Sequence, residues 1–68
     1  MTTILLVEDD ERISEPLLRV LGTEGFQTFH AETGQNGLNF VATDHPDLVL
    51  LDLMLPDIDG LDVCRKIR

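Results

Sequence analysis

Hydrophobic residues in this chain follow two patterns that alternate along the sequence. Short apolar runs predict three β-strands, at Thr2–Val7, Phe26–Ala31 and Leu48–Leu51. After each run, apolar residues recur at helical spacing and predict three helices, at Glu11–Leu21, Gln35–Thr43 and Leu61–Arg68. A β-α-β-α-β-α order is typical of parallel strands joined by right-handed crossovers, so the pattern predicts an α/β domain with a parallel sheet.

The first helix has a clear apolar face and one awkward residue. Its inward positions should be Ile13, Leu17, Val20 and Leu21. If Asp9 or Asp10 caps this helix, Pro16 lies in its second turn and removes a backbone hydrogen bond, which predicts a kink or an irregular first turn. A later start, with Ser14 as the cap, is the alternative.

The second helix should turn Leu38, Val41 and Ala42 toward the sheet. Gly37 lies within this helix at a cost of about 1 kcal/mol relative to alanine, which a close approach of the helix to the sheet would explain. Pro46 ends the unit before the third strand.

Acidic residues follow the first and third strands directly. Glu8 and Asp9 come after Val7, and Asp52 comes after Leu51. If these strands are parallel neighbours, their acidic ends meet at one edge of the sheet, where ligands bind in open α/β folds. Two carboxylates about 5 Å apart repel by roughly 3 kcal/mol at an effective dielectric of about 20, and a proton or Mg²⁺ relieves this repulsion. The competing interpretation is that these acids cap helices and keep the edge soluble.

Composition narrows the classes of function. A net charge of -8 argues against a nucleic-acid or membrane surface and suits a cation site. The single cysteine, Cys64, forms no internal disulfide, so a reducing, cytoplasmic location is the default expectation. No apolar run is long enough to span a membrane. His30 and His45 stand alone in the sequence and are interpreted as surface residues.

Two motifs carry a resemblance to a known family. Val7-Glu-Asp-Asp10 and Leu50-Leu-Asp52-Leu-Met-Leu-Pro56-Asp-Ile-Asp-Gly60 resemble the receiver domain of two-component response regulators. The resemblance implies a flavodoxin-like, doubly wound fold, here with strand order 2-1-3. It implies that Asp52 accepts a phosphoryl group from a sensor histidine kinase, and that Mg²⁺ is bound by Asp9 and Asp52, by Glu8 through water, and by the Met54 carbonyl. It implies a signalling phosphoacceptor, not an enzyme. A phosphohydrolase is disfavoured because Met54 stands where a second acid would be needed.

The resemblance covers only the first half of a receiver domain, so residues 1–68 are interpreted as a partial domain. The family's phosphate-contacting lysine and switch residues lie beyond the matched half, which predicts poor phosphorylation. The third strand becomes an exposed apolar edge, which predicts self-association through this strand or through the exposed helix faces, for example as a two-fold dimer. The alternative function is an assembly unit that keeps its acidic edge without being phosphorylated.

Overall fold

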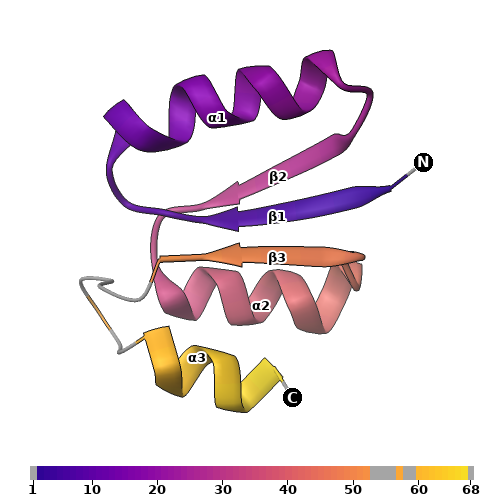
Figure 1. Cartoon of the computed structure of the whole chain (residues 1–68). Coiled ribbons are helices and arrows are strands. Elements are labelled where there is room, and N and C mark those ends of the chain that lie inside the picture. Colours follow the sequence, from indigo (N-terminus) through magenta and orange to yellow (C-terminus); the bar gives the residue numbers. More distant parts are fainter. Residues whose placement is uncertain (1, 53–56, 58–59, 68) are drawn as a thin grey trace.

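The computed structural model describes residues 2–52, 57 and 60–67, and within them it has the predicted order of elements (Figure 1). The strands are β1 (Thr3–Val7), β2 (Gln27–Ala31) and β3 (Leu48–Leu51), and the helices are α1 (Glu11–Thr23), α2 (Gly34–Asp44) and α3 (Gly60–Ile67). Helix α1 covers one face of the sheet, and α2 and α3 lie on the other. None of the helices in the described ranges is long and apolar enough to cross a membrane.

The sheet is parallel with the order β2-β1-β3, as the sequence predicts. Strand β1 lies in the centre, with Leu5 opposite Phe29 on one side and opposite Val49 on the other. At the amino end of β3, the Asp47 carboxylate accepts hydrogen bonds from the Thr3 backbone N–H at 2.8 Å and from the Thr3 hydroxyl at 2.9 Å. This contact fixes the register of β3 against β1.

The main core cluster lies between the sheet and α2. It contains Leu5 and Val7 of β1 and Ala31 at the end of β2. Ile4 and Leu6 are buried as well, because an apolar central strand loses its contact with water on both faces. Partly buried side chains from β2, β3 and α2 pack around the main core cluster, including Phe29 and Phe40, whose ring centroids lie 5.4 Å apart.

Helix α1 begins at Glu11 as predicted but differs from the prediction in its buried face. Asp10 is the N-cap, and the Ser14 N–H bonds to the Asp10 carbonyl at 2.9 Å, so the first turn is regular and the helix continues through Pro16. The expected irregular first turn and the alternative cap at Ser14 were therefore wrong, while a kink at Pro16 stays a prediction. Ser14 is buried, whereas Ile13 is 53% exposed and Val20 is 57% exposed. Helix α1 packs chiefly against one strand, β2. The apolar face of the helix is wider than this contact, so some of its apolar residues remain exposed.

Helix α2 confirms the close approach expected at Gly37. A Cβ at this position would lie 2.8 Å from Val7 Cγ2, which is closer than a side chain can pack. Thr33 caps the helix by accepting a hydrogen bond from the Asn36 N–H. Val41 contacts the core as predicted, whereas Ala42 is exposed, so its predicted inward position was wrong; Phe40 makes the further contact.

Candidate metal and phosphoacceptor site

The three acids that follow β1 and β3 meet at one edge of the sheet. One carboxylate oxygen from each of Glu8, Asp9 and Asp52 lies within 4.8 Å of the others. The predicted convergence is therefore confirmed, while the chemical roles of these residues stay predictions. Met54, the fourth predicted ligand, lies outside the described residues.

Backbone hydrogen bonds continue past the strands and place these acids. The Glu8 N–H donates to the Ala31 carbonyl at 3.0 Å, and the Asp52 N–H donates to the Val7 carbonyl at 3.0 Å. Each acid thus stands one residue beyond its strand but is still held by the ladder of the neighbouring strand. The parallel arrangement accordingly brings the two side chains to the same edge.

Glu8 is the buried member of the cluster, with 7% of its surface exposed. Burial raises the pKa of its carboxyl, and the neighbouring charge of Asp52 and a hydrogen bond to Asp52 raise it further; the N–H of Asp10, which donates to Glu8 Oε1 at 3.3 Å, opposes the rise. Three negative charges at one edge of the sheet are thus unfavourable, and a proton or a divalent cation would relieve their repulsion.

Asp10 does not belong to the cluster. Its Oδ1 accepts from the Arg12 N–H at 2.9 Å as the cap of α1, and its Oδ2 pairs with Arg12 Nη2 at 2.9 Å. These contacts hold the pKa of Asp10 below its usual range. The structural interpretation of Asp10 as a helix cap is confirmed.

The donor set fits a hard divalent cation. Carboxylate oxygens are the ligands that Mg²⁺ accepts together with water, and three of them converge here from two loops. Asp9 is exposed and Asp52 is half-buried, so this side of the cluster is accessible to solvent. A carboxylate beside such a cation is equipped to act as a nucleophile toward phosphorus.

Two further residues contact the loops around the site, and sequence reasoning assigned neither contact. His30 is half-buried, and its Nε2 lies 2.8 Å from the Glu8 carbonyl oxygen. His45 is exposed, as expected. Asp57 accepts hydrogen bonds from the backbone N–H groups of Gly34 at 2.8 Å and Gln35 at 2.9 Å. The parallel register of β2 against β1, with His30 opposite Leu6, is the signal that could have located His30 near Glu8.

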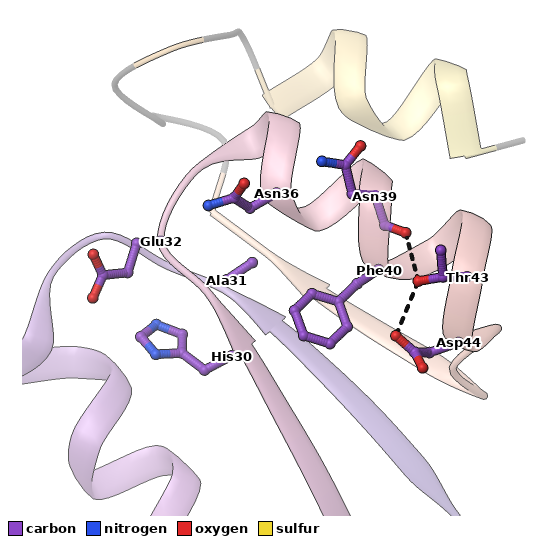
Figure 2. A pocket seen from close by; sticks show the side chains of 8 residues that line it. All are labelled: His30, Ala31, Glu32, Asn36, Asn39, Phe40, Thr43 and Asp44. Atoms are coloured by element: carbon purple, nitrogen blue, oxygen red, sulfur yellow. Dashed lines mark hydrogen bonds between the residues drawn. The ribbon is translucent and has the colours of Figure 1, made fainter.

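A hollow of about 440 Å³ lies beside β2 and α2 (Figure 2). Its lining is largely polar and includes Asn36, Asn39 and Asp44. The Thr43 hydroxyl there donates to the Asn39 carbonyl and also hydrogen-bonds Asp44. None of the acids of the cluster lines this hollow, so the candidate site is the acidic edge of the sheet and not the larger cavity.

Known proteins resemble this chain in both sequence and fold. The response regulator MprA of Mycolicibacterium vanbaalenii is 45% identical over 65 residues, which are 96% of this chain and 28% of that protein. The transcriptional regulatory protein AfsQ1 of Streptomyces coelicolor is 44% identical over 68 residues, which are 30% of its length. The chain thus spans less than a third of these relatives.

Among solved structures, the response regulator TrrA of Thermotoga maritima, in complex with Mg²⁺–BeF, has a TM-score of 0.95 and 40% identity, over 100% of this chain and 59% of that one. A CheY-like receiver domain protein from Methanospirillum hungatei has a TM-score of 0.96 and 31% identity, over 98% of this chain and 54% of that one. The model of the response regulator receiver domain matches residues 4–68. The chain belongs to the family of response regulator receiver domains.

Proposed function

We propose that this chain is a phosphoacceptor segment in which Asp52 receives a phosphoryl group from the phosphohistidine of a sensor kinase, with Mg²⁺ bound by Asp9, Asp52 and the Met54 carbonyl, and by Glu8 through water. The convergence of three carboxylates within 4.8 Å carries this proposal. Support comes from membership of the receiver family and from TrrA, a similar protein solved with Mg²⁺–BeF. The segment acts as a recipient of the phosphoryl group and not as an enzyme.

The chemistry assigned to Asp52 is one displacement at phosphorus. A carboxylate oxygen of Asp52 forms the new O–P bond, the P–N bond to the kinase histidine breaks, and the electron pair of that bond stays on the imidazole nitrogen. Mg²⁺, when bound, neutralises charge on the phosphoryl oxygens. The hydrogen bond from the Asp52 N–H to Val7 holds the nucleophile at the end of β3, and Glu8 and Asp9 supply negative charge for the cation.

The test compares Mg²⁺ binding and chemical phosphorylation in matched variants. Calorimetric titration should show Mg²⁺ binding that Asp9→Asn and Asp52→Asn abolish, whereas Asp44→Asn, which removes an exposed acid outside the cluster, leaves it unchanged. Incubation with phosphoramidate and Mg²⁺, followed by mass spectrometry, should place any label on Asp52. We expect weak labelling, because the matched half of the family's domain lacks the lysine that contacts the phosphoryl group.

Binding that survives Asp52→Asn, or a label on another residue, would show that the acidic cluster is not the site. Full labelling at Asp52 would confirm the phosphoacceptor and contradict the expectation of poor phosphorylation. Cytoplasmic location, which the single cysteine favours, belongs to the same proposal.

We also propose that the chain self-associates through β3. This strand has β1 as its one neighbour in the described sheet, and its first residue, Leu48, is 48% exposed. An apolar edge strand presents unpaired backbone groups to a second copy. Sedimentation should show dimers that Leu48→Lys dissociates, whereas Val20→Lys, at an exposed apolar residue of α1, should not. A compact monomer at micromolar concentration would refute this.

Assembly is also the second candidate function, and Asp52→Asn separates it from phosphoacceptance. In an assembly unit the variant should dimerise like the original chain and gain stability from relief of repulsion in the cluster. In a phosphoacceptor it loses Mg²⁺ binding and labelling.

A further inference from the structure

His30, which lies outside the acidic cluster, hydrogen-bonds the turn that carries Glu8 and Asp9. His30 lies near the end of the edge strand β2, half-buried, with Nε2 2.8 Å from the Glu8 carbonyl oxygen. Because a carbonyl oxygen only accepts hydrogen bonds, Nε2 must carry the hydrogen and donate it. The imidazole is therefore fixed in orientation as well as in place.

Glu8 needs such a donor because it is buried beyond the end of its strand. Its N–H is bound by the Ala31 carbonyl, which extends the pairing of β1 with β2 by one residue. A buried carbonyl without a partner costs free energy, and the next residue of β2, Glu32, no longer belongs to the strand. Two consecutive residues, His30 and Ala31, thus bind both backbone groups of Glu8.

The hydrogen bond acts on Asp9 through the planar peptide group. The Glu8 carbonyl and the Asp9 N–H belong to one rigid unit, so fixing the carbonyl oxygen also fixes the direction in which the chain enters Asp9. On the far side of Asp9, Asp10 is held as the cap of α1 and donates its N–H to Glu8 Oε1. Asp9 is exposed, and its backbone is therefore restrained from both neighbours.

We propose that His30 is a positioning residue, whose hydrogen bond to the Glu8 carbonyl presets the Glu8–Asp9 peptide and thereby raises the affinity of the acidic cluster for a divalent cation. This inference rests on the proposed Mg²⁺ site. It concerns the backbone of the turn, and His30 itself is not a ligand.

The surroundings of the ring separate this role from a packing role. His30 lines the hollow of about 440 Å³ beside α2 and also one of about 280 Å³ beside α1. Figure 2 shows the imidazole at the margin of the first hollow, next to Glu32. Because His30 is half-buried and lines both hollows, its side chain is only partly packed, so its replacement should leave the fold intact.

Three variants of His30 test the hydrogen bond. His30→Phe keeps a ring without the donor, His30→Met keeps an unbranched chain without the donor, and His30→Gln places an amide N–H at a similar reach. Calorimetric Mg²⁺ titration should show affinity about tenfold weaker for the Phe and Met variants, the size typical of lost outer-shell partners, and within about twofold of the original for Gln. His45→Gln, at the other histidine, which is exposed, should change nothing.

A second readout needs no metal. In chelator, the Asp9 amide resonance should shift in the Phe and Met variants and return toward its original position in the Gln variant. If His30→Phe does not fold, the comparison of Met with Gln, which have equal length, decides the question. Unchanged affinity and unchanged Asp9 resonance in the variants without a donor would overturn the proposal, as would a Gln variant as weak as Met. Absence of Mg²⁺ binding in the unaltered chain would instead contradict the proposed function, while the Asp9 resonance would still report on His30.

Discussion

The contact between Gly37 and Val7 predicts that Gly37→Ala destabilises the chain although it improves helix propensity. Alanine gains about 1 kcal/mol over glycine inside a helix. Against this, the new Cβ would lie 2.8 Å from Val7 Cγ2 and 3.3 Å from Val7 Cγ1. Val7 is fully buried and β-branched, so it has no free rotamer with which to move away. Overpacking of this kind costs about 1–3 kcal/mol, which leaves a net loss of about 1 kcal/mol.

The matched control is Gly22→Ala. Gly22 lies within α1, and a Cβ there would meet no atom within 4 Å. This variant should therefore gain about 0.5–1 kcal/mol in free energy of unfolding, from the higher helix propensity of alanine alone. The difference between the two variants isolates the contact with Val7. Thermal unfolding, followed by circular dichroism at one fixed protein concentration, measures the difference. The midpoint temperature should fall by about 4–8 °C for each 1 kcal/mol of unfolding free energy that is lost.

A stabilised Gly37→Ala variant, equal to Gly22→Ala, would refute the reasoning, because it would mean that α2 does not approach β1 this closely. The variant should also weaken Mg²⁺ binding, since Val7 precedes Glu8 and displacement of the strand end moves the cluster. Retained affinity despite lost stability would show that β1 absorbs the strain elsewhere.

Three other predictions concern carboxylates. Asp57→Ala should lower the free energy of unfolding by about 1 kcal/mol, because two N–H groups at the start of α2 lose their acceptor; Asp57→Asn keeps one acceptor and should lose less in urea unfolding. Glu8 has a raised pKa, so its contribution to stability is present below the ordinary pKa of glutamate and is lost as the pH rises through the raised value; Glu8→Gln, unfolded in chelator across this range, should not show that loss. Hydrogen bonds from the Thr3 N–H and hydroxyl lower the pKa of Asp47, so its contribution to stability is present above the ordinary pKa of aspartate and is lost as the pH falls through the lowered value. Asp47→Asn should therefore lose less stability in acid than the original chain, and a parallel decline in both proteins would contradict the assignment.

Local patterns predicted the elements and the cluster because both depend on short-range features. Apolar runs that stop at acids mark the ends of strands, and a parallel order then brings Glu8 and Asp52 together without knowledge of side-chain packing. Gly37 was predictable for a similar reason, since a glycine inside a helix needs compensation.

Contacts between distant segments were not predictable in the same way. The hydrogen bond from His30 to Glu8 joins residues 22 apart, and the cap from Asp57 to Gly34 joins residues 23 apart. The buried face of α1 was misjudged because periodicity gives the apolar stripe but not the strand on which it rests. Ser14, small enough to lie against the sheet, became the buried residue, and Ile13 stayed exposed.

The ring pair of Phe29 and Phe40 can report on the packing of α2 against the sheet. The sequence has three phenylalanines and neither tryptophan nor tyrosine, so incorporation of fluorinated phenylalanine adds three resonances. Two of these labels would sit against the core between sheet and α2, while the third, on Phe26, is 36% exposed just before β2. Dispersion of the two inner signals would follow docking of α2 onto the sheet, and the outer signal would serve as a solvent reference within the same molecule.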